Sequence, residues 1–248
     1  PVQIGPWDAA LVVGVSLQAT VMAYLYRPRW KALVYSLPVP FTLASLALGA
    51  PVGVTHVAGL IVMLLFFHAV RGMHQGLGWP IVPCIVLAAL GYVATGMALA
   101  RVLPDTPVAF WSAVALAGVL GVVLLLTMKH REEPGHRSPL PVWIKLPAVA
   151  CVIVVLVLLK QYLRGFMAMF PMMGVITAYE ARHSLWTIGR QVPVLLVAFV
   201  PMVALVRLLQ GEVGLGPALA CGWVVYLSVL ALITRRMWAG RAAAAREA

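Results

Sequence analysis

Long, uncharged apolar runs make up most of this chain, and they constrain its fold more than any other feature of the sequence. Most runs are about 18 to 24 residues long, which is the length that an α-helix needs to cross about 30 Å of hydrocarbon. A membrane β-barrel would instead show strands of about 10 residues with alternating polarity. Hydrophobic residues make up 63% of the chain and charged residues 10%, too little charge to cover a soluble domain. We therefore predict an all-α integral membrane protein.

The apolar runs predict nine transmembrane helices. Their approximate ranges are 9–26, 32–50, 54–70, 80–103, 108–128, 140–159, 165–179, 190–208 and 214–234. A polar break at 160–164 separates the sixth helix from the seventh, and the count would fall to eight if this break were only a kink. We expect a solvated basic loop at 129–139 and a basic tail at 235–248.

The distribution of Lys and Arg predicts the orientation of the chain. If the loop after the first span is cytoplasmic, fourteen of the eighteen basic residues lie on that side and four on the other. The four are Arg101, Lys160, Arg164 and Arg207. Because cytoplasmic loops carry the excess of Lys and Arg, this bias predicts an outside N-terminus and a cytoplasmic C-terminus, in a multi-pass protein of a cell inner membrane. With eight spans, Arg235 and Arg236 would lie outside, so nine is preferred.

An internal repeat is visible at an offset of 133 residues. Arg27 falls on Lys160, Lys31 on Arg164 and Pro38 on Pro171, and with one residue of slippage Pro83 falls on Pro217. We predict two four-helix repeats, at 9–103 and 140–234, joined by a linker helix at 108–128. Four spans and one linker reverse the direction of the second repeat, so the repeats are inverted. Inverted repeats are typical of secondary transporters, although duplication without transport is the alternative.

The predicted substrate site lies at two Pro-interrupted spans that occupy corresponding positions in the repeats. Proline removes a backbone donor and frees a carbonyl group, and paired Pro- or Gly-interrupted spans indicate a transport site. Ordinary helix kinks are the alternative. The candidate substrate-binding residues are Ser36, Pro38, Pro40, Thr42 and Ser45 in the first broken span, and Pro171, Gly174, Thr177 and Tyr179 in the second.

A second candidate group follows directly on Tyr179. Glu180, Arg182 and His183 are predicted to serve coupling or gating, because Glu180 can reach His183 at i+3 on a helix and the two could titrate as a pair. The alternative is a charge cluster at a helix end, where charged side chains reach the headgroup region at small cost.

Several functions are disfavoured by the sequence. No nucleotide, serine-hydrolase or zinc-protease motif is present, so we expect no enzyme activity, no cofactor and no metal ion. The formal net charge of +11 lies in short clusters between apolar runs, which indicates contact with anionic lipid and disfavours nucleic acid. Ionisable residues are scarce at the span centres, which favours a lipidic, amphipathic or neutral solute over a simple ion.

The stretch from Arg164 to Tyr179, with its Phe-Pro pair, and the stretch from Leu215 to Leu227 resemble the GlpM-like bacterial inner-membrane proteins. The resemblance covers about residues 150–234, and the first repeat departs from it. It implies an ancestral four-span unit and supplies no catalytic residues.

Two functions follow as hypotheses. The first is a small permease whose partners are membrane lipids, alone or as a homo-oligomer. The second is a non-catalytic scaffold subunit of a larger membrane complex. A permease predicts a hydrated path lined by Ser36, Thr42, Ser45 and Thr177, whereas a scaffold predicts that these side chains form hydrogen bonds within the bundle.

Overall fold

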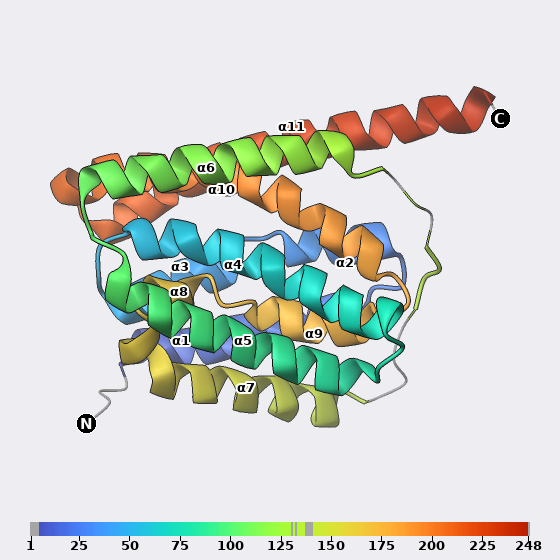
Figure 1. Ribbon diagram of the computed structural model, residues 1–248, viewed down its shortest axis with the longest axis horizontal. Coiled ribbons are helices and arrows are strands. Elements are labelled where there is room, and N and C mark those ends of the chain that lie inside the picture. Colours follow the sequence, from blue (N-terminus) through green and yellow to red (C-terminus); the bar gives the residue numbers. More distant parts are fainter. Residues whose placement is uncertain (1–4, 130, 132, 137–140, 248) are drawn as a thin grey trace.

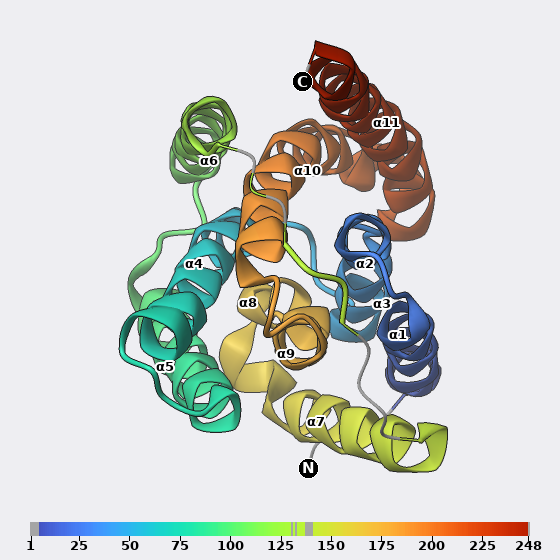
Figure 2. The same cartoon turned by 90° about the vertical axis from the view of Figure 1, so that its right-hand side faces the viewer.

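The computed structural model describes residues 5–129, 131, 133–136 and 141–247, and every regular element within these ranges is a helix. The elements are α1 Pro6–Tyr24, α2 Pro28–Tyr35, α3 Val39–Leu48, α4 Val54–Arg71 with a π-helical end at Gly72–Gly76, α5 Ile81–Val102, α6 Pro107–Thr127, α7 Val142–Leu163, α8 Gly165–Ala168, α9 Met172–Glu180, α10 Leu185–Val213 and α11 Leu215–Glu247. Figure 1 shows them running along one common direction, and Figure 2 looks along it. The predicted all-α class is confirmed.

Seven helical segments of the described chain are long and apolar enough to cross a membrane. They are α1, the pair α2–α3, α4 with its π-helical end, α5, α6, α10 and residues 215–239 of α11. They correspond to seven of the nine predicted spans. The predicted spans at 140–159 and 165–179 correspond to α7, several of whose side chains are not described, and to the short pair α8 and α9.

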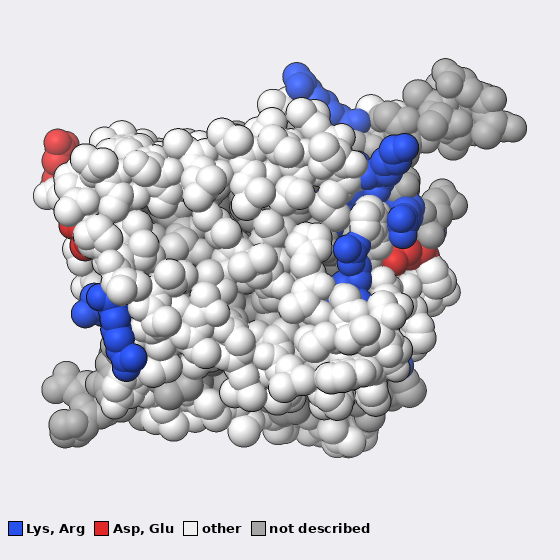
Figure 3. Space-filling model, viewed as in Figure 1, with Lys and Arg blue, Asp and Glu red and all other residues white. Residues whose placement is uncertain are grey.

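Charged side chains are absent from the middle of the face drawn in Figure 3. On the face drawn in Figure 3, Lys, Arg, Asp and Glu lie at the two ends, with a wide uncharged band between them. Large apolar side chains are exposed on the long helices, among them Leu90 of α5 and Val119 and Leu126 of α6. A surface of this kind is unfavourable in water and suits a hydrocarbon environment. Together with the seven apolar helices, it indicates a multi-pass membrane protein.

The broken spans are the main departure from straight helices. The predicted span at 32–50 divides into α2 and α3 around residues 36–38, and the predicted span at 165–179 divides into α8 and α9 around residues 169–171. The predicted break at 160–164 is also present, because α7 ends at Leu163 and Arg164 has a positive φ of 49° that interrupts the helix. Figure 2 places α8 and α9 near the centre of the bundle.

Glycines allow α8 to approach α4 closely. A Cβ added to Gly59 of α4 would lie 2.6 Å from the Cβ of Met169, just after α8. A Cβ added to Gly165, at the start of α8, would overlap His56 and Thr55 of α4. Small residues bring helix backbones together in membranes, where packing has to replace the hydrophobic driving force. The second broken span is therefore held in the core by α4.

The segments predicted as loop and tail contribute to the helices at the end of the bundle. Residues 130, 132 and 137–139 of the predicted basic loop and residue 248 of the predicted tail lie outside the described residues. Within the predicted loop, the carboxylate of Glu133 accepts the backbone N–H groups of Trp186 and Thr187 at 3.2 and 2.6 Å and so caps α10. The segment predicted as a tail continues α11 as far as Glu247.

Candidate functional site

The first helix break, between α2 and α3, frees carbonyl groups that a buried glutamine satisfies. Pro38 has no N–H, so the carbonyl of Val34, four residues earlier, loses its usual helical donor and accepts the N–H of Leu37 at 3.2 Å. The side-chain amide of Gln18, on α1, donates to this carbonyl at 2.8 Å and to the carbonyl of Leu37 at 3.3 Å. Gln18 therefore adds a second donor to the carbonyl of Val34 and supplies one to the carbonyl of Leu37, at a break where hydrocarbon offers none.

Pro40 frees the carbonyl of Ser36 in the same way, and this carbonyl accepts a hydrogen bond from the Tyr226 hydroxyl of α11. The Ser36 hydroxyl donates to the carbonyl of Ala32 at 2.7 Å and accepts from the amide of Gln191, on α10, at 2.6 Å. Ser36 and Tyr226 are both fully buried. The first break is therefore held by two helices from the second half of the chain.

The second break, between α8 and α9, is supported in a similar way from the first half. Pro171 cannot donate to the carbonyl of Met167, and the N–H of Phe170 does so instead at 3.1 Å. One residue earlier, the carbonyl of Phe166 accepts the hydroxyl of Tyr92, on α5, at 2.9 Å. Tyr92 is buried between α4 and the second broken span.

The two breaks face each other across a small cavity of about 50 Å³. The predicted residues Pro38, Pro40, Pro171 and Gly174 all line it. Its other walls are apolar and come from both halves of the chain: Tyr35, Leu37, Phe41, Met63, Ala168, Met169, Phe170, Met172, Met173, Leu195 and Phe199. The structure therefore brings together prolines that lie 133 positions apart in the sequence.

Gly174 is required at the cavity wall because of close packing. A Cβ at this position would lie 2.7 Å from the Cβ of Pro171 and 2.9 Å from the ring of Phe67. Both distances are shorter than van der Waals contact allows, so any larger residue would displace α9 from α4.

The predicted hydroxyl groups form hydrogen bonds within the bundle. Thr42 donates to the carbonyl of Pro38 at 2.9 Å and accepts from the indole N–H of Trp223 at 2.7 Å. Thr177 donates to the carbonyl of Met173 at 2.6 Å. Ser45 is fully buried, and its hydroxyl has no hydrogen-bond partner. In this conformation the four predicted hydroxyls do not line an open path.

Glu180 pairs with a lysine that the sequence analysis did not connect with it. The ammonium group of Lys31, on α2, lies 3.9 Å from the Glu180 carboxylate, with both side chains about 2% exposed. The same ammonium donates to the backbone carbonyls of Glu180 at 3.0 Å and His136 at 2.8 Å. Because Glu180 is the last residue of α9, Lys31 places a positive charge at the negative end of that helix dipole. Lys31 therefore joins the two broken spans at one end of the bundle.

The other members of the predicted coupling group surround this ion pair. The ring of His183 lies 4.6 Å from the ring of His136, and the guanidinium of Arg182 lies 5.1 Å from the ring of Tyr179. Burial, followed by the positive charges of Arg182 and its neighbours, lowers the pKa of His136. In the described part of the chain, no three His, Cys, Asp or Glu side chains group as a metal site requires.

A larger cavity of about 320 Å³ opens on the side of the bundle, among α1, α5, α7 and α9. Its volume lies within the range of small-molecule pockets. Its walls are almost entirely apolar, and its polar members come from α1 and the end of α9. The lining residues are Ala19, Thr20, Ala23, Val82, Ile85, Val86, Ile144, Val149, Val152, Val175, Ile176, Tyr179 and Glu180.

The side chains that support the breaks were not recognised from sequence. Gln18, Tyr92, Gln191 and Tyr226 are polar residues within apolar runs, which is the available signal, because a polar side chain in hydrocarbon needs a partner. Lys31 was aligned with Arg164 in the repeat but was not assigned a role.

Comparison with models of known families, with characterised proteins and with solved structures finds no match to this chain. The resemblance of residues 150–234 to GlpM-like proteins stays a prediction.

Proposed function

We propose that this chain is a small inner-membrane permease for a lipidic or amphipathic solute, with nine spans arranged as two inverted four-helix repeats. The observation that carries the proposal is the meeting of two Pro-broken spans, one from each half, around a cavity inside the bundle. Secondary transporters with inverted repeats place their substrate sites at discontinuous helices of this kind.

The directions of the helices support the inverted repeat. In Figure 1, α1 and α7 run in opposite directions, as do α4 and α10, and α5 and α11. These are the pairs that the 133-residue offset matches. Tyr92 and Tyr226 are separated by 134 positions, and each donates its hydroxyl to a carbonyl beside the break in the other repeat. Similar roles for tyrosines at corresponding positions are expected when a duplicated unit packs against its inverted copy.

The chemistry of the cavities supports an apolar or amphipathic solute. The break cavity is lined by Pro, Met, Phe and Leu side chains, and the lateral cavity is lined mainly by Val, Ile and Ala. Three of the four predicted hydroxyls already have partners in the bundle. A hydrated ion would have to exchange its water shell for such walls at high cost, whereas a hydrocarbon tail would not.

The test is cysteine accessibility along both broken spans. Cys84, Cys151 and Cys221 are replaced, and single cysteines are placed from residue 36 to 45 and from 170 to 179. Membrane-impermeant thiol reagents are then applied from each side in turn, with a cysteine at lipid-facing Leu90 as the unreactive control and one at Gly78 as the reactive control. A permease predicts labelling on one face of both spans deep in the membrane. Labelling that stops at the helix ends on both sides would refute the proposal.

The second candidate is a scaffold subunit, favoured by the hydrogen bonds that hold Ser36, Thr42 and Thr177 within the bundle. A scaffold predicts no deep labelling and stable co-purification with partner subunits, so the same experiment separates the two functions.

A further inference from the structure

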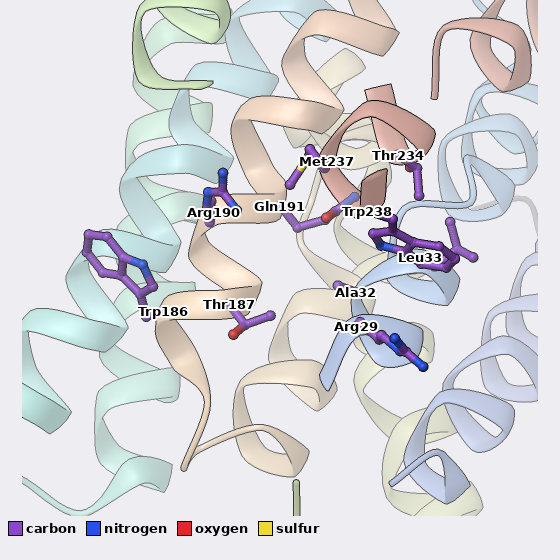
Figure 4. Close-up of a pocket in the computed structure, with 10 residues that line it drawn as sticks. All are labelled: Arg29, Ala32, Leu33, Trp186, Thr187, Arg190, Gln191, Thr234, Met237 and Trp238. Atoms are coloured by element: carbon purple, nitrogen blue, oxygen red, sulfur yellow. The ribbon is translucent and has the colours of Figure 1, made fainter. Parts of the chain in front are cut away.

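The lateral cavity among α1, α5, α7 and α9 is large enough to hold a hydrocarbon chain, whereas two other cavities of the described bundle are too small in this conformation. The break cavity measures about 50 Å³. A cavity between α2, α10 and α11 measures about 30 Å³, and Figure 4 shows Arg29 and Arg190 at its wall extending away from each other. The lateral cavity measures about 320 Å³. For comparison, an apolar cavity of about 150 Å³ stays dry and binds benzene.

The lateral cavity opens to the side of the bundle between α5 and α7. Its rim is about half exposed, at Val82 and Val86 of α5 and at Ile144 of α7. Its floor is buried, at Ala19 of α1 and Val149 of α7. Figure 2 shows α5 and α7 diverging towards the end of the bundle that faces the viewer. The mouth therefore faces the surroundings of the bundle, and the floor lies against its interior.

The cavity lies at the depth of one bilayer leaflet. Its lining residues are near the end of the bundle where α1 and α9 finish and where α5 and α7 begin. The distribution of Lys and Arg predicts this end to be cytoplasmic. Along α7 the lining extends from Ile144 to Val152, which is about 12 Å at a rise of 1.5 Å per residue. Half of the hydrocarbon thickness of a bilayer is about 15 Å, so the cavity matches one leaflet.

The polarity of the walls follows that of a lipid. Ten of the thirteen lining residues are Ala, Val or Ile, so the walls suit a hydrocarbon chain. Tyr179 and Glu180 lie at the outer end of the cavity, where α9 finishes and headgroups begin. The Thr20 hydroxyl donates to the carbonyl of Ser16 at 2.7 Å, and the Glu180 carboxylate faces Lys31 at 3.9 Å. These polar groups therefore already have partners within the protein.

A hydrocarbon chain is the occupant that these features favour. Water in the cavity would give up hydrogen bonds to enter walls that offer few partners. The mouth opens at the depth where a bilayer presents acyl chains, so these are the groups that meet it. Val175 and Ile176 of α9 line the cavity and are partly exposed, although Figure 2 places α9 near the centre of the bundle. A chain in the cavity would cover this apolar surface.

We propose that the lateral cavity binds one acyl chain of a phospholipid from the adjoining leaflet. The chain enters between α5 and α7 and lies against Val175 and Ile176 of α9, while the headgroup stays outside, at the level of Tyr179. This inference goes beyond the permease proposal, because an acyl chain can be held here without being transported.

The test locates acyl chains by photocrosslinking. The full chain is placed in nanodiscs of phosphatidylcholine that contain a small fraction of the same lipid with a diazirine near the middle of one acyl chain. After irradiation, lipid adducts are mapped to peptides by mass spectrometry. The wild type is expected to carry adducts on α9, at Val175 or Ile176, as well as on lipid-facing α6. An absence of α9 adducts would overturn the proposal in favour of a protein segment as the occupant.

Matched variants show whether the α9 adducts depend on the mouth of the cavity. Val86→Trp adds bulk at the rim, and Leu90→Trp adds the same bulk one turn further along α5, at an exposed residue outside the lining. Val86→Trp should lower the ratio of α9 to α6 adducts by roughly tenfold, since steric overlap of about 1.4 kcal/mol gives that factor. Leu90→Trp should leave the ratio unchanged. Equal losses in the two variants would overturn the proposal.

A third variant fills the cavity from within. Ile176→Trp should lower the same ratio as strongly as Val86→Trp, and melting temperatures show whether it folds. If it does not fold, the rim variant still decides, because Val86 is half exposed. The readout is binding alone, so cysteine labelling that refuted the permease proposal would leave this result standing.

Discussion

Removing the Tyr226 hydroxyl tests the central structural argument, that a buried side chain replaces the donor missing at Pro40. In Tyr226→Phe the carbonyl of Ser36 loses this donor, and Pro40 has no N–H to offer. Both residues are fully buried, so water does not reach the carbonyl. Side-chain hydrogen bonds in membrane proteins average about 0.6 kcal/mol and reach about 1.7, whereas an orphaned buried acceptor costs about 1–3 kcal/mol. We therefore expect a loss of about 1.5 kcal/mol in the free energy of unfolding.

The assay is reversible unfolding in mixed micelles of a neutral detergent and dodecyl sulfate, followed by circular dichroism. Tyr92→Phe should show a loss of similar size, because the Phe166 carbonyl beside the second break loses its donor. Tyr162→Phe is the matched control, since Tyr162 is 54% exposed, and its effect should stay within about 0.5 kcal/mol. If Tyr226→Phe is no more destabilising than this control, the carbonyl has another partner and the explanation of the break is wrong.

Three further predictions concern the ion pair, the cavity wall and the loop. Lys31→Met should destabilise the protein by about 3 kcal/mol, because it removes the ammonium that faces the buried Glu180 carboxylate at 3.9 Å, and adding Glu180→Gln should recover part of that loss in the same unfolding assay. Gly174→Ala should cost about 1–3 kcal/mol through overpacking, whereas Gly91→Ala, where an added Cβ meets nothing within 4 Å, should be neutral or stabilising. The pKa of His136 is lowered in the folded state, so as the pH falls the unfolded chain takes up the proton first. The contribution of the neutral His136 ring to stability is therefore complete above pH 6.5 and is lost as the pH falls below that value. Melting temperatures between pH 7.5 and 5.5 should therefore fall more steeply in the wild type than in His136→Asn, and parallel curves would contradict this assignment.

The sequence was sufficient to predict the helical membrane class and the positions of the breaks. Long, uninterrupted apolar runs are compatible with few structures other than membrane-spanning helices. A proline in such a run shows that a backbone donor is missing there, and this can be read without knowledge of the fold. Pro38 and Pro171 were therefore recognised, and the structure places both at the same cavity.

The partners at the breaks could not be predicted, because they depend on which helices meet. Gln18 and Tyr226 lie 16 and 190 residues from the carbonyls of Val34 and Ser36 that they satisfy. The i+3 and i+4 rule suggested His183 as the partner of Glu180, but that rule describes one continuous helix, and α9 ends at Glu180 itself. The carboxylate has an ion pair with Lys31, 149 positions away, which no rule for a single helix could find.

The hydrogen bonds at the breaks also indicate which parts of the bundle can move together. Tyr92 ties α5 to the second broken span, and Tyr226 ties α11 to the first. Each broken span is therefore hydrogen-bonded to the last helix of the opposite half. This divides these helices into two groups that could move as rigid bodies, α5 with α8–α9 and α11 with α2–α3. The bonds from Lys31 to the end of α9 run between these groups. A motion that separates the broken spans at this end has to break the Lys31 bonds and can leave those of the tyrosines intact. Under the permease proposal, Lys31 and Glu180 form the gate, and Lys31→Met should increase labelling of cysteines near the breaks from the side of residues 72–80.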